Sequence, residues 1–136
     1  MDYLIAVKSP AYGSQGAYSA YQFAQVLLQA GHRIRQIFFF QEGVSNGNGL
    51  VYPANDEFDM VKAWQQLSRE WQIPLGLCVA AAQRRGVVDA QTARADSSTN
   101  LAEGFAIVGL GEFMIDRKST RLNSSHLNES RMPSSA

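Results

Sequence analysis

Hydrophobic and polar positions along the chain follow two periods, one typical of strands and one typical of helices. Short apolar runs rich in β-branched and aromatic residues predict three buried strands, at residues 3–7, 33–40 and 73–79. Apolar residues that recur every three or four positions predict helices at 18–30, 56–71 and 80–86. Strands and helices therefore alternate, which predicts an α/β fold: a three-layer α/β/α arrangement around a mostly parallel sheet.

The hydrophobic pattern does not decide the structure of two segments. Residues 41–56 are rich in Gly and Asn and long for a loop, and a functional or partner-facing loop and a plain surface loop are equally compatible with them. The apolar stretch near the end predicts either a strand at 105–108 or a helix around 109–114. Sites in parallel sheets form beyond the carboxyl ends of the strands. We therefore expect the loops at 9–16 and 41–56 to meet the turn at Cys78.

Residues 116–136 differ from the rest of the chain. They are rich in Ser, Asn and Arg and lack a hydrophobic period, which is typical of a disordered polar tail. Their back-translation resembles the two constant parts of a common short-read sequencing adapter, with "LNE" where the variable index lies. We therefore hypothesise that 116–136 is a non-native, disordered tail and that 1–115 is the domain. A clonal gene that encodes the same tail would refute this hypothesis.

Composition narrows the class of protein. The 136 residues indicate one domain, and 46% of them are hydrophobic, enough for a sizeable core. The formal net charge is zero, which gives no indication of direct nucleic-acid binding or of a membrane surface. A single cysteine excludes an internal disulfide framework and favours a reducing compartment. With no evident signal peptide or membrane span, we expect a soluble cytoplasmic domain.

Cys78 is the first candidate for chemistry. The reactive form of a cysteine is the thiolate, which free N–H groups at a helix start favour, and Cys78 directly precedes "VAAAQRRG". Arg84 and Arg85 lie at the far end of that short helix, where they suit its negative pole or a partner surface better than contact with the sulfur. On spacing alone, a small buried core residue remains the more common role for such a cysteine.

The other candidates are weaker. The segment "SPAYGSQGAYS" could cradle a phosphate before a helix, but it matches neither common phosphate-loop motif, and an ordinary loop explains it better. His32 follows a helix-ending glycine and is expected to be exposed. Asp56, Glu57 and Asp59 suit a helix start and lack metal-ligand spacing. Without His126 in the tail, His32 is the remaining histidine, and a Ser-His-Asp triad is not indicated.

Several stretches resemble the DsrE-like sulfurtransferase family. They are "SPAYGSQGAYSAYQFAQVLL", "FFFQEGV", "DEFDMVKAWQQL", "LCVAAAQRRGVVD", "SSTNLAEGF" and "GLGEF", in family order over residues 1 to about 115. The resemblance implies a DsrE-like sheet whose C-terminal helix and strand are truncated here. It also implies that Cys78 is the catalytic residue and carries a persulfide, with no organic cofactor and no metal.

The resemblance also implies partners. Family members of this type work with TusB-like and TusC-like subunits as a heterohexamer, accept sulfur from a TusA-like donor and pass it to a TusE-like acceptor. The sulfur ends as 2-thiouridine at the tRNA wobble position. The alternatives are a non-catalytic interaction subunit of a related DsrE-type complex in sulfur oxidation, and a flavodoxin-like nucleotide or flavin binder that uses Ser9 to Gly16.

Overall fold

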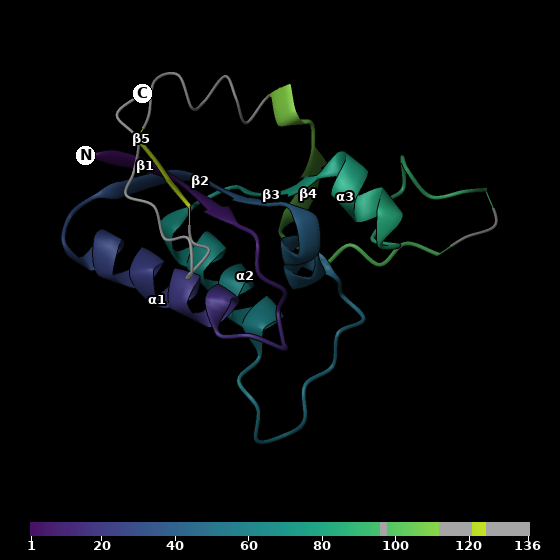
Figure 1. Ribbon diagram of the computed structural model, residues 1–136, viewed down its shortest axis with the longest axis horizontal. Coiled ribbons are helices and arrows are strands. Elements are labelled where there is room, and N and C mark those ends of the chain that lie inside the picture. The colour runs from purple at the N-terminus through teal and green to yellow at the C-terminus, as the bar shows by residue number, and fades with distance from the viewer. Residues whose placement is uncertain (96–97, 112–120, 125–136) are drawn as a thin grey trace.

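A five-stranded parallel sheet in the order β4-β3-β2-β1-β5 forms the centre of the computed structural model, which describes residues 1–95, 98–111 and 121–124 (Figure 1). The strands are β1 (Asp2–Val7), β2 (Arg33–Phe39), β3 (Leu75–Cys78), β4 (Phe105–Val108) and β5 (Arg121–Ser124). The helices are α1 (Gly16–Gln29), the 3-10 helix η1 (Gln41–Gly47), α2 (Met60–Trp71) and α3 (Val79–Arg84). The predicted α/β fold with a parallel sheet is confirmed.

The ends of the helices have local causes. Asp59 is the N-cap of α2 and accepts a 3.1 Å hydrogen bond from the backbone N–H of Lys62, so α2 begins at Met60 rather than at 56 as predicted. Gln72 ends α2 in the left-handed conformation. The predicted helix at 18–30 begins earlier, because Gly16 opens α1 against Ser9 with no room for a side chain.

The structure also bears on the two open segments. Residues 105–108 form the strand β4, paired in parallel with β3, and the described residues 110–111 that follow it are helical. The first half of the long segment at 41–56 is the 3-10 helix η1 rather than loop. Residues 41–47 escape helical pattern recognition because their Gly and Asn residues are typical of turns, and burial of Val44 and Asn46 holds the element in place.

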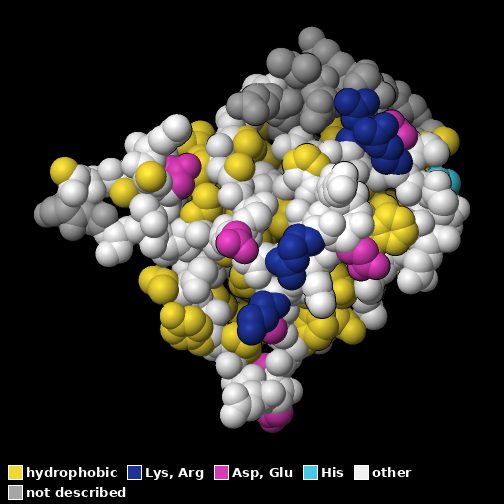
Figure 2. All heavy atoms as spheres, turned by 180° about the vertical axis from the view of Figure 1, so that it is seen from behind, with side chains coloured by type: hydrophobic (Ala, Val, Ile, Leu, Met, Phe, Trp, Pro, Cys, Tyr) yellow, Lys and Arg dark blue, Asp and Glu magenta, His cyan; other side chains and the backbone are white. Residues whose placement is uncertain are grey.

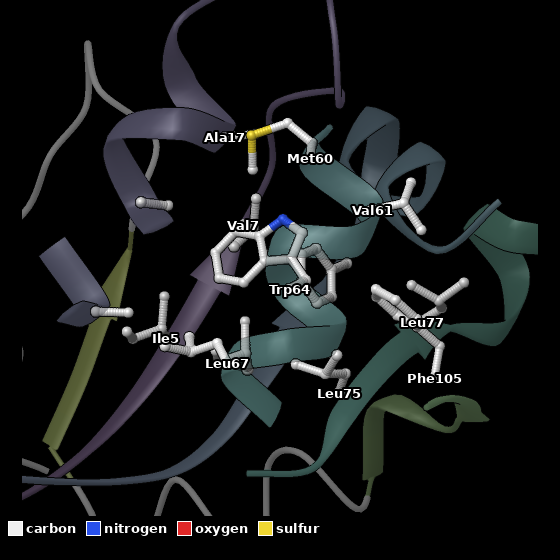
Figure 3. Close-up of a cluster of buried hydrophobic side chains, with 14 of the residues drawn as sticks. Ile5, Val7, Ala17, Met60, Val61, Trp64, Leu67, Leu75, Leu77 and Phe105 are labelled. Atoms are coloured by element: carbon white, nitrogen blue, oxygen red, sulfur yellow. The ribbon is translucent and has the colours of Figure 1, made fainter. Parts of the chain in front are cut away.

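The main core lies between the sheet and the two long helices. Trp64 of α2 is fully buried in this core (Figure 3). Its ring meets the rings of Tyr21 and Phe39 edge-on, at centroid distances of 5.6 and 5.2 Å. Aliphatic side chains from β1 and β3 surround it, Ile5 and Leu77 among them. Helices α1 and α2 therefore cover the same face of the sheet (Figure 1).

The opposite face carries a smaller apolar cluster. Leu4, Ala6 and Phe38 are buried there, and the partly buried side chains of Cys78 and Val108 pack against them. Most of the helix that the sequence allows around 109–114 lies outside the described residues.

Strand β5 comes from the segment predicted to be a disordered tail. Arg121–Ser124 pair in parallel with Tyr3–Ala6 of β1, at the edge of the sheet. An unpaired edge strand leaves its N–H and C=O groups without partners, and any short extended segment in reach can satisfy them. These four residues therefore form a strand in the structure, whereas their composition predicted disorder. The remainder of 116–136 lies outside the described residues.

The described surface mixes all side-chain types. Lys and Arg lie close to Asp and Glu on the face seen in Figure 2, with hydrophobic side chains between them. None of the helices in the described ranges combines the length and hydropathy that a membrane crossing needs.

Candidate functional site

Cys78 stands where a strand becomes a helix. It is the last residue of β3 and the N-cap of α3, with extended backbone angles (φ −60°, ψ 124°) and a partly exposed side chain. It lies opposite Val108 of β4 in the parallel ladder. Its partly buried side chain packs against the smaller cluster on the face that α1 and α2 leave uncovered, and it also contacts the edge of the main core. The predicted strand-to-helix turn is confirmed.

The loops expected to meet at this edge do so. The backbone N–H of Ala11 donates to Ser45 Oγ at 2.8 Å, which joins the loop after β1 to η1. Gly43 lies so close to Val7 that a Cβ there would strike the Val7 carbonyl oxygen. The segments that follow β1 and β2 are therefore closely packed against each other. Helix η1 also lies next to α3 at the end of β3.

Asn46 lies at the centre of this packing, and the sequence analysis did not predict a role for it. Its side chain has no exposed surface and uses three hydrogen bonds. Nδ2 donates to the carbonyl oxygens of Ser9 (3.1 Å) and Gly43 (2.8 Å), and Oδ1 accepts from the indole Nε1 of Trp64 (3.0 Å). An Asn in a Gly-rich run is usually a turn residue, so only its close spacing to Val44 could have suggested burial.

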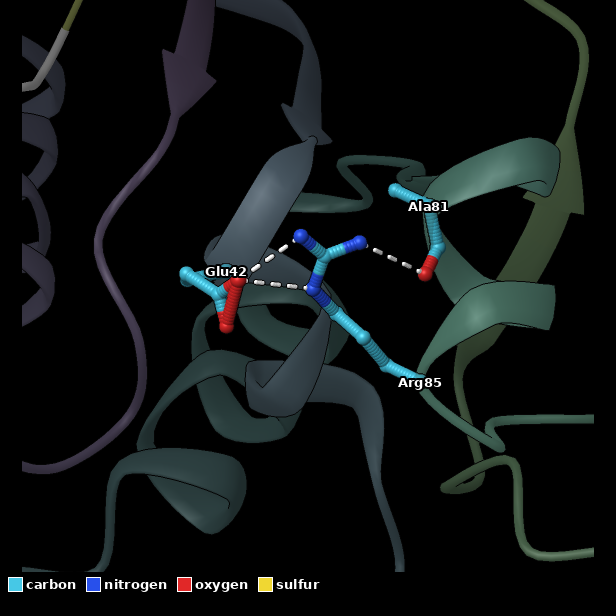
Figure 4. Close-up of polar contacts among 3 residues, drawn as sticks. All are labelled: Glu42, Ala81 and Arg85. Atoms are coloured by element: carbon cyan, nitrogen blue, oxygen red, sulfur yellow. Dashed lines mark hydrogen bonds and ion pairs between the residues drawn. The ribbon is translucent and has the colours of Figure 1, made fainter.

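Arg85 and Glu42 form an ion pair between α3 and η1. Arg85 Nε and Nη2 donate to Glu42 Oε2 at 2.9 and 2.7 Å, and Nη1 donates to the carbonyl oxygen of Ala81 at 3.2 Å (Figure 4). The expectation that an arginine meets the negative end of the short helix is confirmed for Arg85, through Ala81. The pair with Glu42 was not predicted.

The ion pair shifts the pKa of both partners. The hydrogen bond from Arg85 is the main cause that lowers the pKa of the Glu42 carboxyl. The hydrogen bond to Glu42 is the main cause that raises the pKa of Arg85, and a smaller contribution comes from electrostatic attraction to Cys78. Arg85 is therefore a permanent cation that Glu42 holds next to α3.

His32 lies at the other end of the sheet. It precedes the first residue of β2, whereas Cys78 ends β3, and the two strands run parallel. It is half-buried rather than exposed as expected, with its ring edge-on to Tyr3 at 5.5 Å. The described residues thus place no histidine beside Cys78, and His126 lies outside them.

The two remaining candidates have structural roles. Within the loop at 9–16, Ser9 is buried and the N–H of Gly16 donates to Ser14 Oγ at 3.3 Å, so loop groups that could bind phosphate are in part used internally. In the acidic group, Asp59 caps α2, and Glu57 Oε1 accepts from the N–H of Ala54 at 2.7 Å.

A hollow of about 790 Å³ lies between the segment 49–59 and residues 99–103, and Cys78 does not line it. Leu50 and Tyr52 on its rim are 61% and 80% exposed. Exposed apolar side chains of this size are typical of a protein-facing surface more than of an enclosed substrate pocket.

Comparisons with known proteins place the chain among named relatives. The DsrE/DsrF-like family model matches residues 1–115. The "Sulfurtransferase TusD homolog" of Haemophilus influenzae is 63% identical over 114 residues, covering 84% of this chain and 90% of the relative. The "Sulfurtransferase TusD" of Pectobacterium carotovorum is 54% identical over 114 residues, covering 82% and 88%. The crystal structure of the ychN protein from E. coli superposes with a TM-score of 0.70 at 18% identity, covering 89% of this chain and 95% of that one, and supports the fold alone.

Proposed function

The chain belongs to the DsrE/DsrF-like family and is a sulfurtransferase, and on this basis we propose that it carries sulfane sulfur on Cys78. One observation carries the proposal. The only cysteine of the sequence is partly exposed at the carboxyl end of β3, on a turn next to the segment that follows β2. A thiol that served only to fill the core would need none of these features.

The proposed transfer has two steps and no net redox change. The Cys78 thiolate attacks the outer sulfur of a donor persulfide, a new S–S bond forms on Cys78, and the donor leaves as a thiolate that takes the electron pair of the broken S–S bond. An acceptor thiolate then attacks the outer sulfur of the Cys78 persulfide, and Cys78 leaves as a thiolate. No metal or organic cofactor enters either step.

Other proteins supply the remaining thiols in this scheme, because the chain has only one. We propose a TusA-like protein as donor and a TusE-like protein as acceptor, with TusB-like and TusC-like subunits beside this chain in a heterohexamer. The sulfur is then destined for 2-thiouridine at the tRNA wobble position, with no direct contact between this chain and nucleic acid. Exposed apolar side chains such as Tyr52 and Leu50 support a protein-facing surface.

The location that fits this chemistry is the cytoplasm. A free, partly exposed cysteine persists as a thiol in a reducing compartment and is oxidised outside one. The proposal therefore places the chain with its donor and acceptor in the cytoplasm.

The test is sulfur loading followed by mass spectrometry. The full chain is incubated with a persulfide donor, desalted and weighed intact before and after reduction. We expect a gain of one sulfur atom that reduction removes, and no gain in Cys78→Ser. Because no other cysteine is present, a gain in Cys78→Ser can only be non-specific.

The outcomes separate the competing functions. Loading followed by loss of the sulfur to a second thiol protein supports the relay. No loading, together with normal assembly with TusB-like and TusC-like subunits, contradicts it and favours a non-catalytic interaction subunit. Flavin retained through purification would favour the flavodoxin-like alternative.

A further inference from the structure

Two apolar residues stand on either side of Cys78 in the sheet. On one side is Val108, the partner of Cys78 in the parallel ladder between β3 and β4. On the other side is Phe40. The register pairs Phe39 with Leu77, and Phe40 continues β2 by one residue, with extended angles (φ −138°, ψ 166°) and a backbone hydrogen bond to β1. Phe40 is therefore the neighbour of Cys78 on the side of β2.

Side-chain contacts place both neighbours on the same face as the thiol. The ring of Phe40 stacks on the ring of Phe38 at a centroid distance of 6.3 Å, with 12° between the ring planes. Phe38 pairs with Gly76, two residues before Cys78. The side chain of Val108 leans over the same glycine, since a Cβ on Gly76 would lie 2.7 Å from Val108 Cγ2. Phe40, Cys78 and Val108 all pack against the smaller buried cluster, so the thiol lies in an apolar row.

We propose that Phe40 and Val108 are specificity-determining residues, whose apolar side chains flank the sulfur on Cys78 and favour thiols carried by an uncharged protein segment over thiols that bring an ionic group. This role rests on the proposed function of Cys78 as a sulfur carrier. It adds the class of thiol with which that site exchanges sulfur.

The chemistry of the exchange explains the selection. In each step a thiolate comes within bonding distance of a sulfur atom, so the groups beside that thiolate displace water from Phe40 and Val108. An ionic group of either sign that loses water against an apolar side chain costs free energy. An uncharged segment that covers the same two side chains gains free energy. Neither residue forms or breaks a bond, so the two-step transfer stays balanced as written above.

The test has to separate loss of water from electrostatic attraction, because Lys8 follows β1 and Arg85 follows α3. An electrostatic field acts on anions and cations in opposite directions, whereas loss of water penalises both. Three methanethiosulfonates with the same ethyl chain are therefore compared on the sole cysteine: the neutral hydroxyethyl, the anionic sulfonatoethyl and the cationic trimethylammonioethyl reagent. Each forms a disulfide with Cys78 and releases methanesulfinate. The thiolate fraction cancels in the ratio of two rate constants.

Phe40→Ala is expected to raise the rate constants of both charged reagents, relative to the neutral one, about fivefold, which corresponds to about 1 kcal/mol of barrier. Val108→Thr keeps the shape of the side chain and should raise both ratios about twofold. The matched controls are Phe58→Ala and Val26→Thr, at exposed positions on the side of the sheet that α1 and α2 cover. Both controls should keep the native ratios.

Two outcomes would overturn the role of the apolar row. In the first, the ratios stay native in Phe40→Ala and in Val108→Thr while both variants unfold at the native temperature. In the second, one charged reagent becomes faster and the other slower, which indicates a changed field instead of a changed access of water. If Phe40→Ala does not fold, Val108→Thr decides alone, because it preserves the volume of the side chain.

The loaded chain tests the class of thiol directly. Three short peptides differ only in whether alanine, aspartate or lysine precedes their single cysteine, and mass spectrometry follows their removal of sulfur from Cys78. After division by their rates with a small-molecule persulfide, the alanine peptide should be faster than both charged peptides, and Phe40→Ala should reduce both differences. Equal rates for the three peptides on the native chain would contradict the selection.

Failure of this role and failure of the carrier function can be distinguished. The methanethiosulfonates require no sulfur on Cys78, so a native chain that fails to load sulfur but shows the expected ratios refutes the carrier function and leaves the apolar selection standing. A chain that loads sulfur normally, with native ratios in both Phe40→Ala and Val108→Thr, keeps the carrier function and refutes the selection.

Discussion

The side-chain oxygen of Asn46 accepts a hydrogen bond of 3.0 Å from the indole Nε1 of Trp64, and neither side chain has any exposed surface. The bond joins the 3-10 helix η1 to α2 across the interior. It links a fully buried aromatic residue of the core to the loops at the carboxyl end of the sheet. Stability of the core and shape of the candidate site are therefore coupled through one amide.

We predict that Asn46→Ala lowers the free energy of unfolding by about 2–3 kcal/mol, because it leaves the Trp64 indole and the Ser9 and Gly43 carbonyls without partners. Urea unfolding measures the change. Asn55→Ala, an exposed loop substitution, is the matched control and should cost less than about 0.5 kcal/mol. Equal effects of the two substitutions would contradict the role of Asn46.

Gly43→Ala is expected to destabilise the protein by about 1–3 kcal/mol and to slow sulfur loading of Cys78. The added methyl group meets the Val7 carbonyl oxygen, so η1 has to move away from β1 and carries Glu42 with it. Gly109→Ala is a suitable control, since a Cβ at Gly109 meets no atom closer than 4.0 Å. Thermal unfolding and the mass assay measure the two effects. A Gly43→Ala variant that unfolds and loads like the native chain would show that η1 tolerates displacement.

Asp59→Ala should cost about 1 kcal/mol, whereas Asp56→Ala should cost almost nothing. Asp59 is the residue whose carboxylate accepts from the Lys62 N–H at the start of α2. Asp56 lies in the turn before the helix and is exposed. Chemical denaturation of both variants measures the difference. A cost that is equal at the two positions would mean that general charge near the helix start, rather than the cap, provides the stabilisation.

The ion pair between Glu42 and Arg85 predicts a stability that depends on pH. The pKa of Glu42 is lower in the folded than in the unfolded chain, mainly because of the hydrogen bond from Arg85. Its contribution is therefore complete above the ordinary carboxyl pKa and is lost as pH falls through the lowered folded value. The native chain should thus be more stable than Glu42→Gln at neutral pH, and the two should converge in acid. Urea unfolding at a series of pH values tests this, with Glu103→Gln as the exposed control, and a difference that persists unchanged into acid would contradict it.

Removal of residues 116–136 should lower the midpoint of thermal unfolding. The deletion takes away β5 and leaves the backbone of Tyr3–Ala6 unpaired at the sheet edge. Identical unfolding of the truncated and the 136-residue chains would mean that β5 contributes no net stability.

The sheet and the position of Cys78 could be predicted because they depend on local patterns. Apolar runs identified β1, β2 and β3, and helical spacing identified α1 and α2. The alternation of the two implied parallel strands with their loops at a common edge. Cys78 follows from this order alone, since it is where the third strand ends.

The support of the site could not be predicted, because it depends on contacts between segments far apart in the chain. Glu42 and Arg85 are 43 positions apart, and either one in isolation resembles an ordinary surface charge. Asn46 is 37 positions from Ser9 and has the sequence context of a turn. A disordered tail was predicted from composition. Composition carries no information about an unpaired strand edge elsewhere in the fold, with which a short polar segment such as 121–124 can pair.

In a protein with a single cysteine, the fraction of molecules that carry sulfur can be measured at one residue. Any thiol-directed dye reacts at this one residue, either with the thiol or with the outer sulfur of the persulfide. A dye attached through the outer sulfur is linked by a disulfide, so the fraction of label that reduction removes equals the fraction of molecules that carried sulfur. Stopped-flow labelling could then follow donor encounter and acceptor discharge in real time, without engineered reporter positions. The scarcity of cysteine that limits this chain to one half of each exchange also makes it a ready-made kinetic probe of its partners.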